Sequence, residues 1–183
     1  MKSETSLLTV IGKDRPGIIA RVTEELFRQG CNLEDVSMTI LEGEFAMILV
    51  VSFAAEKKER IRQAFKAIEK ERGLSFFWKD VRGRLVRGEK HGKNSESYLI
   101  TAAGRDRTGI VYKISRELAG RGLNITDLNS RILGRGRSAV YVMMLEADIP
   151  KKFKIAKLTG ALRKLASELR VDIRIKPVER VEL

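Results

Sequence analysis

The chain contains one cysteine, one histidine and three prolines among its 183 residues. A single cysteine excludes an internal disulfide and any metal site built from several cysteines. The single histidine, His91, lies in a polar segment away from any periodic apolar pattern, which argues against histidine-dependent triads, Cys–His pairs and two-histidine metal sites. We therefore expect a protein that is not an enzyme and that uses no metal and no cofactor. Cys31 lies between a glycine and an apolar segment, so we expect a packed thiol rather than a nucleophile.

Long apolar runs are also missing from the sequence. No segment approaches the roughly 18 apolar residues that span a bilayer. Residues 1–12 lack the basic start, the long apolar stretch and the small-residue cleavage site of a signal peptide. These absences favour a cytoplasmic protein without a membrane partner.

Acidic residues are in the minority, which gives the chain a formal net charge of +12 at pH 7. Residues 1–91 carry about +3 of this charge and residues 92–183 about +9. The basic residues gather in residues 82–90, in residues 151–157 and around a hairpin with Arg131, Arg135 and Arg137. Nucleic acid attracts such a charge, but no recognition helix and no aromatic residues between the basic ones are evident. We therefore expect direct nucleic-acid binding to be weak, and a solvated charge-rich surface or an acidic protein partner stays an alternative interpretation.

What the sequence does contain is an internal repeat. Moving the chain by 92 positions against itself aligns residues 9–41 with residues 101–133. The identical pairs include Gly12, Asp14, Gly17, Asn32 and Asp35 of the first half. Two copies with a period of about ninety residues indicate a duplicated domain rather than a solenoid.

The first half predicts the order strand, helix, strand, strand, helix, strand. Residues 6–12 form a short apolar run, and a helical pattern follows from Pro16 until Gly30. Residues 33–41 and 45–53 predict a hairpin that leads to a second amphipathic helix and a closing strand. The residues expected to face the core are Ile19, Val22 and Leu26 of the first helix and Ile61, Phe65 and Ile68 of the second helix. Val36, Met38 and Ile40 are expected to share one face of the second strand.

The second half predicts the same order. Its first helix places Ile110, Val111, Ile114 and Leu118 on one face. Two right-handed βαβ crossovers separated by a hairpin predict an antiparallel four-stranded sheet with both helices on one face, which is the ferredoxin-like arrangement. The predicted class is therefore α+β, with tandem βαββαβ domains at residues 1–86 and 96–183 and a polar linker at residues 87–95.

Two motifs in each half carry a family resemblance. A βαββαβ unit with G-x-D-R-[PT]-G-I after its first strand and G-x-N-[LI]-x-D after its first helix resembles the ACT domain, a regulatory module that typically binds amino acids. A tandem pair without an attached enzyme is similar to the glycine cleavage system transcriptional repressor group. This resemblance implies a small amino acid such as glycine or serine as ligand, a protein partner such as a DNA-binding regulator, and compatibility with a homo-oligomer. It also implies sites between paired domains, with the first loop of one domain facing the second strand of another.

The turn before the first helix has the chemistry of a ligand site in its own right. The first backbone N–H groups of a helix lack intrahelical partners and lie at its positive dipole end, so they can hold a carboxylate. A glycine lets the ligand approach the backbone, and an Asn and an Asp at the next strand can accept hydrogen bonds from an ammonium group. The candidate ligand-binding residues are Asp14, Pro16, Gly17, Ile18, Ile19, Asn32 and Asp35 in the first half, and Asp106, Thr108, Gly109, Ile110, Asn124 and Asp127 in the second.

Three of these residues also have a purely structural interpretation. Asp14 can cap the helix, Asn32 can adopt a left-handed turn after Gly30, and Asp35 can pair with a surface arginine. With the ligand interpretation, we expect a non-enzymatic, amino-acid-sensing regulator of transcription that acts through a protein partner. The rival interpretations are a regulatory subunit of an amino-acid metabolic enzyme and a basic nucleic-acid-binding protein.

Overall fold

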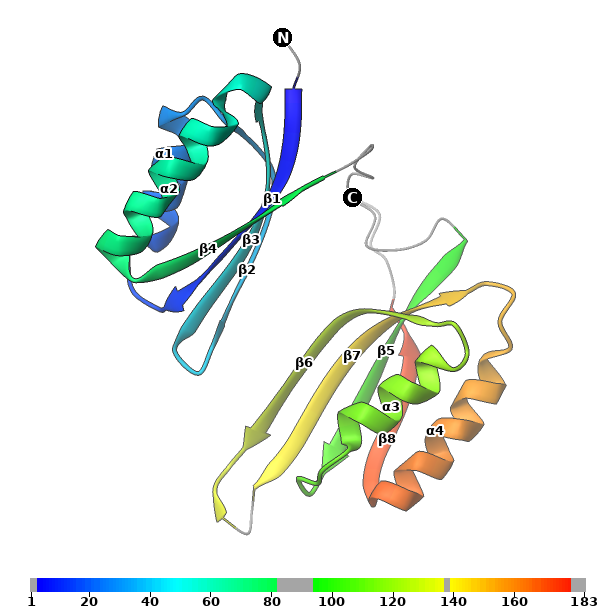
Figure 1. The fold of residues 1–183 in the computed structure, drawn as a ribbon. Coiled ribbons are helices and arrows are strands. Elements are labelled where there is room, and N and C mark those ends of the chain that lie inside the picture. Colours follow the sequence, from blue (N-terminus) through cyan, green and yellow to red (C-terminus); the bar gives the residue numbers. More distant parts are fainter. Residues whose placement is uncertain (1–2, 82–93, 137–138, 179–183) are drawn as a thin grey trace. The chain divides into compact units, whose positions relative to one another are not determined.

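A computed structural model describes residues 3–81, 94–136 and 139–178 of the chain (Figure 1). The chain divides into two compact units, Met1–Val86 and Arg87–Leu183. The first contains β1 (Ser3–Lys13), α1 (Ile18–Arg28), β2 (Asn32–Leu41), β3 (Glu44–Ala54), a short 3-10 turn η1 (Ala55–Lys57), α2 (Lys58–Arg72) and β4 (Leu74–Asp80). The second contains β5 (Ser95–Gly104), α3 (Ile110–Ala119), β6 (Asn124–Leu133), β7 (Val140–Pro150), α4 (Ile155–Leu169) and β8 (Val171–Pro177).

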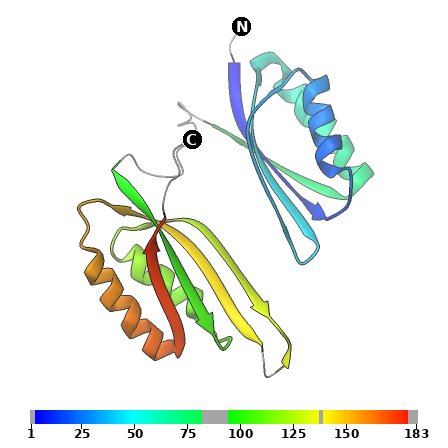
Figure 2. The ribbon, with the colours of Figure 1, turned by 180° about the vertical axis from the view of Figure 1, so that it is seen from behind.

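Each unit is a four-stranded sheet with two helices on one of its faces (Figures 1 and 2). The strand orders are β2-β3-β1-β4 and β6-β7-β5-β8, and every neighbouring pair is antiparallel. The predicted α+β class, with two tandem ferredoxin-like βαββαβ domains, is confirmed. Of the predicted linker at residues 87–95, residues 87–93 lie outside the described residues and Ser95 opens β5. The basic residues 82–90 and Arg137 also lie outside them.

Alternation along the central strands builds each core. In β3, Phe45, Met47, Leu49, Val51 and Phe53 are buried beneath the helices, while the residues between them face the other side of the sheet. The predicted core positions of α2, Ile61, Phe65 and Ile68, are fully buried. The ring of Phe65 meets Phe76 and Trp78 edge-on, with centroid distances of 5.0 and 5.4 Å. The second core is built in the same way around Ile100, Met143, Leu145, Ile114 and Leu158.

The buried face of the first helix differs from the prediction by one residue. α1 begins at Ile18 rather than at Pro16, because Gly17 adopts a left-handed conformation at the N-cap. Ile18, Val22 and Leu26 therefore face the core, and Ile19 is 46% exposed. Val111, at the matching position of α3, is 37% exposed for the same reason. The prediction that Ile19 and Val111 face the core was wrong.

The outer strand β2 carries apolar residues that the helices do not cover. Val36, Met38 and Ile40 share one face, as predicted, and pair with Leu49, Met47 and Phe45 on the helix side of the sheet. Their side chains remain nearly half exposed because β2 lies at the sheet edge. Among the described residues, no helix is long and apolar enough to cross a membrane.

Candidate ligand site

The start of α1 presents backbone donors toward open space. The amide of Arg21 donates to the carbonyl of Gly17 at 2.9 Å and forms the first helical hydrogen bond. The three amides before it, on residues 18–20, have no acceptor within the helix. A Cβ atom placed on Gly17 would meet no atom within 4 Å, so a ligand has room beside this backbone. The φ angle of 91° at Gly17 also explains why the position favours glycine.

Asp14 does not cap this helix. No side-chain hydrogen bond caps the N-terminus of α1 within the described part of the chain. The backbone amide of Asp14 instead donates to the carbonyl of Gly43 at 2.8 Å and ties the loop to the β2–β3 turn. The capping interpretation of Asp14 was therefore wrong, and its carboxylate lies on an exposed loop.

The start of α3 repeats this geometry in the second domain. Gly109 has φ 91°, and the amide of Lys113 donates to its carbonyl at 2.9 Å. The atom nearest to a Cβ on Gly109 is Cε of Lys113, at 3.9 Å. Asp106 and Thr108, like Asp14 and Pro16 in the first domain, are exposed in the loop before the helix. The duplicated motif therefore gives two closely similar backbone arrangements.

Asn32 and Asp35 lie on β2 with local hydrogen-bond partners. The amide of Asn32 donates to Glu34 at 2.9 Å, and Oδ1 of Asp35 accepts from the backbone amide of Val36 at 2.8 Å. Glu42 and Arg170 are the non-glycine residues with positive φ in the described ranges, so Asn32 does not occupy a left-handed turn. No arginine pairs with Asp35 among those residues. Both structural interpretations were therefore wrong, although both side chains keep free acceptor capacity.

Within one domain the loop and the start of β2 lie at opposite ends of the sheet. Asn32 pairs with Ser52, which pairs with Thr5 near the beginning of β1, whereas the loop follows the end of β1. The seven residue steps from Thr5 to Gly12 correspond to about 24 Å along a strand. Asn124 and Gly104 are separated in the same way in the second domain. One amino acid cannot span this distance, so a site that uses both groups needs the loop of one ACT-like unit and the strand of another.

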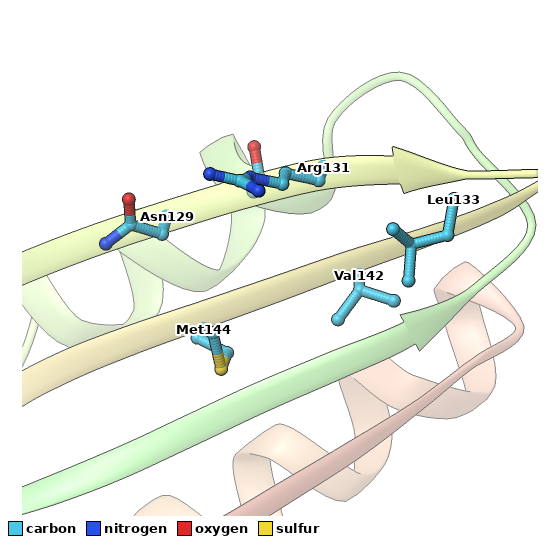
Figure 3. Close-up of a pocket in the computed structure, with 6 residues that line it drawn as sticks. Asn129, Arg131, Leu133, Val142 and Met144 are labelled. Atoms are coloured by element: carbon cyan, nitrogen blue, oxygen red, sulfur yellow. The ribbon is translucent and has the colours of Figure 1, made fainter. Parts of the chain in front are cut away.

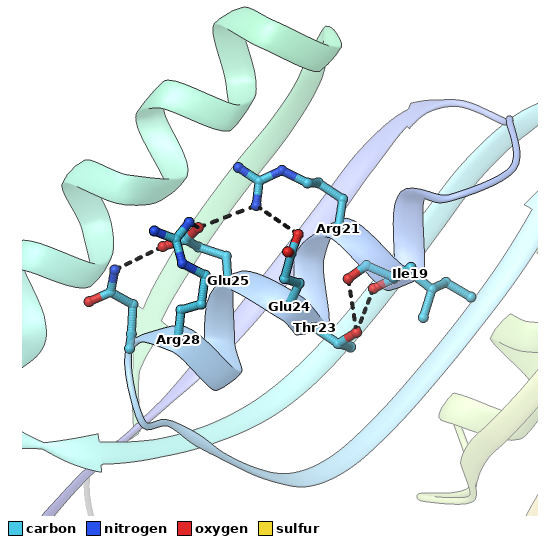
Figure 4. A network of polar contacts seen from close by, with 8 residues as sticks. Ile19, Arg21, Thr23, Glu24, Glu25 and Arg28 are labelled. Carbon is cyan, nitrogen blue, oxygen red and sulfur yellow. Dashed lines mark hydrogen bonds and ion pairs between the residues drawn. The ribbon is translucent and has the colours of Figure 1, made fainter.

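A buried carboxylate that the sequence did not single out lies on α1 (Figure 4). Glu25 is 4% exposed and accepts hydrogen bonds from Gln29 at 2.8 Å, Arg21 at 3.2 Å and Arg28 at 3.3 Å. Burial alone would raise the pKa of Glu25, but the hydrogen bonds from Gln29 and Arg21 and the charge of Arg28 outweigh it, so this pKa is lowered. The spacing i−4, i+3 and i+4 of the three donors is the signal by which the network could have been found.

Cys31 is a packed thiol, as predicted. It is half-buried and lies against the first core. Burial raises the pKa of the Cys31 thiol, and the nearby charge of Lys57 only partly counters this effect. A nucleophilic role would need the opposite shift.

Comparison with known proteins now places the fold in a family. The sequence profile of the ACT domain matches residues 4–79 and 96–176, which correspond to the two domains. The chain belongs to the ACT domain family. A UPF0237 protein of Methanopyrus kandleri is 43% identical over 49 residues, which cover 27% of this ACT-domain chain and 54% of that protein. The chain thus spans about half the length of this relative.

Two solved structures resemble the whole ACT-domain chain. An unknown protein from Galdieria sulphuraria has a TM-score of 0.78 at 25% identity, and the match covers 97% of this chain and 100% of that one. A candidate glycine cleavage system transcriptional repressor has a TM-score of 0.71 at 17% identity, with 98% and 100% covered. At 17% identity the second likeness concerns the fold alone.

Proposed function

We propose that this ACT-domain protein senses a small amino acid, such as glycine or serine, and transmits the bound state to a protein partner without catalysing a reaction. The observation that carries the proposal is the pair of helix starts at α1 and α3. Each offers three backbone amides that have no acceptor within the helix, at the positive end of its dipole. The left-handed glycine beside them leaves room for a carboxylate.

The ammonium group of the ligand meets the start of a second strand from another ACT unit, such as that of a second chain. Asn32 and Asp35, or Asn124 and Asp127, supply amide and carboxylate oxygens for it. This division follows from the separation of loop and strand start within a single domain. A homo-oligomer would supply such a unit from a second chain.

A role in transcription, through a DNA-binding regulator, is the form of this function that we favour. It is supported by the shared fold of the candidate glycine cleavage system transcriptional repressor. A regulatory subunit of an amino-acid metabolic enzyme would use the same ligand chemistry. Affinity capture with the tagged protein in the presence and absence of its amino acid separates the two, because the regulator or the enzyme would be identified directly.

Calorimetric and thermal-shift titrations with each standard amino acid test the sensing function. A ligand that binds only the folded state raises its stability.

The variants Ile19→Glu and Val111→Glu test the position of the site. Each introduces a carboxylate beside the helix-start amides, where it competes with the carboxylate of the ligand. The same substitution does not weaken the helix, because acidic residues in a first helical turn stabilise it. We expect these variants to lose binding without losing stability. Phe27→Glu, at an exposed position in the last turn of α1, is the matched control and should still bind. The absence of a response from the unmodified protein to any amino acid would refute the sensing function.

The positive charge of residues 92–183 supports a second candidate, direct nucleic-acid binding. Affinity from phosphate contacts comes largely from counterion release, so it falls steeply with salt and does not depend on base sequence. We expect such weak and unspecific binding in fluorescence anisotropy with mixed DNA and RNA probes. Nanomolar, sequence-dependent binding at physiological salt would place this candidate first.

A further inference from the structure

The face of the second sheet that the helices leave uncovered contains a hollow of about 380 Å³ (Figure 3). It lies over β6 and β7, near the hairpin that joins them, and is lined by Asn129, Ser130, Arg131, Leu133, Val142 and Met144. Side chains alternate between the two faces of a strand. Tyr141, Met143 and Leu145 of β7 are buried in the core, so Val142 and Met144, which alternate with them, lie on the uncovered face. The register pairs Asn129 with Met144 and Arg131 with Val142, so two polar side chains stand beside two apolar ones.

The guanidinium of Arg131 is the unpaired charge of this hollow. Figure 3 shows it extending along β6 toward Asn129, above Val142 and Met144 of the next strand. Among the residues that the structure describes, no carboxylate pairs with Arg131, although Asp127 lies on the same face of the same strand. The carboxylate of Asp127 instead accepts a hydrogen bond from Asn129 at 2.9 Å. The guanidinium thus keeps its planar set of donors for an anion.

The matching surface of the first domain lacks the cation. Ser37 and Thr39 occupy the positions of Asn129 and Arg131, since the 92-residue shift relates each pair. Thr39 pairs with Ala46, whereas Arg131 pairs with Val142. The cation is therefore a feature of the second domain, whereas the apolar residues Leu41 and Ile48 of the first domain occupy the positions of Leu133 and Met144.

We propose that this hollow binds a small carboxylic acid with a branched aliphatic chain. The carboxylate accepts paired hydrogen bonds from Arg131, a geometry that a planar guanidinium favours. The aliphatic chain covers Leu133, Val142 and Met144, of which Met144 is 51% exposed. The volume lies at the lower end of the range for small-ligand sites, about 300 to 1,000 Å³, and so suits a ligand of this size. The site is separate from the helix starts and does not depend on the sensing function proposed for them.

Methyl NMR of the methionine-labelled full chain tests the proposal, with 4-methylpentanoate and L-leucine as probes. The methyl signal of Met144 should shift with either probe, whereas that of its buried neighbour Met143 should stay in place. The two probes share the carboxylate and the branched chain, so their relative affinity shows whether an ammonium group contributes. Arg131→Gln should weaken binding about tenfold or more, because a charge-assisted pair is lost. Arg174→Gln is the matched control, since Arg174 faces the same side from β8 but is paired with Asp172 at 2.7 Å.

Three outcomes would overturn the proposal. The first is a Met144 signal that neither probe moves at millimolar concentration, and the second is unchanged affinity in Arg131→Gln. The third is a Met144 signal that depends on protein concentration without any probe, because a second copy would then cover the hollow. An unchanged Met143 signal verifies that Arg131→Gln is folded. The variants Ile19→Glu and Val111→Glu should leave the Met144 response intact, which separates this site from the helix starts.

Discussion

In the N-terminal domain the helix after the first strand has Gly17 as its N-cap, and in the C-terminal domain the corresponding helix has Gly109 as its N-cap. Both glycines have φ 91°, and both accept the first helical hydrogen bond at 2.9 Å. The side chains placed on this shared backbone differ. Glu25 of α1 is buried among three donors, while Glu117 of α3 pairs with Arg121 and is more exposed. Thr39 in the first sheet corresponds to Arg131 in the second.

This difference shows which features of the duplicated unit are the same in both copies and which have diverged. The turn geometry depends on backbone angles that few residues other than glycine adopt, so both copies retain it. The outer surfaces carry no such constraint, and most of the net charge has accumulated on residues 92–183. The turn alone therefore cannot assign a ligand to one domain, and the side chains around it must do so.

The largest effect that we expect comes from the core of the N-terminal domain. Phe65→Ala removes a fully buried ring that contacts Phe76 and Trp78, and should cost about 3–5 kcal/mol. Trp78 is the one tryptophan of the chain, so its fluorescence during urea unfolding reports on this domain. Phe27→Ala makes the same chemical change at a position that is 82% exposed. It should change the free energy of unfolding by no more than about 0.5 kcal/mol. Similar losses in both variants would contradict the assigned core.

The Glu25 network predicts an acid-sensitive N-terminal domain. The pKa of Glu25 is below its ordinary value of 4.5, so its contribution to stability is complete above that value and is lost as the pH falls through the folded-state pKa. Glu25→Gln should cost about 1–3 kcal/mol at neutral pH, since the three charge-assisted hydrogen bonds that its carboxylate accepts are weakened. Denaturation followed by Trp78 fluorescence should show this difference shrinking in strong acid. Glu117→Gln is the matched control in α3, where the smaller burial predicts a smaller loss. A pH-independent difference for Glu25→Gln would argue against the charged network.

Replacement by alanine should change the stability of the C-terminal domain in opposite directions at two of its glycines. Gly109→Ala forces a side chain into the left-handed region and should cost about 1–2 kcal/mol. Gly160 lies within α4, where an added Cβ would meet no atom within 4 Å. Gly160→Ala should therefore raise the free energy of unfolding by up to about 1 kcal/mol, because alanine favours a helix more than glycine does. Chemical denaturation followed by circular dichroism measures both. A gain in stability from Gly109→Ala would mean that the turn does not need its left-handed angle.

The element order was predictable because it depends on local patterns. Alternating apolar residues in residues 45–53 and helical spacing around Phe65 each extend over several residues, so the strand and the helix follow from sequence alone. The phase of α1 was not predictable in this way. Ile18 and Ile19 are equally apolar, and the left-handed angle at Gly17 decides which of them is buried.

The candidate site was predictable only in part, for a physical reason. The backbone amides without helical acceptors at the start of α1 were predictable, because the Pro-Gly pair before them is a helix-start signal. The separation of Asn32 from this loop depends on strand direction and register, which no short motif encodes. The hollow beside Arg131 depends on the pairing of β6 with β7, so it too becomes visible only in the folded sheet.

The smallest effect that we expect tests a buried hydroxyl of the C-terminal domain. Tyr141 pairs with Gly104 as Phe45 pairs with Gly12, so the two aromatic residues occupy matching positions. The hydroxyl of Tyr141 is buried without a hydrogen-bond partner in the described ranges. Tyr141→Phe should therefore raise the free energy of unfolding by up to about 1 kcal/mol, because an unsatisfied polar group is removed.

Circular dichroism during urea denaturation measures the effect of Tyr141→Phe. The matched control is Tyr112→Phe on the exposed side of α3, which should change the free energy of unfolding by close to zero. A loss of stability in Tyr141→Phe would show that the hydroxyl holds a buried water or another bound group. The position would then contribute to a chemical difference between the C-terminal domain and the N-terminal one, where phenylalanine can make no such bond.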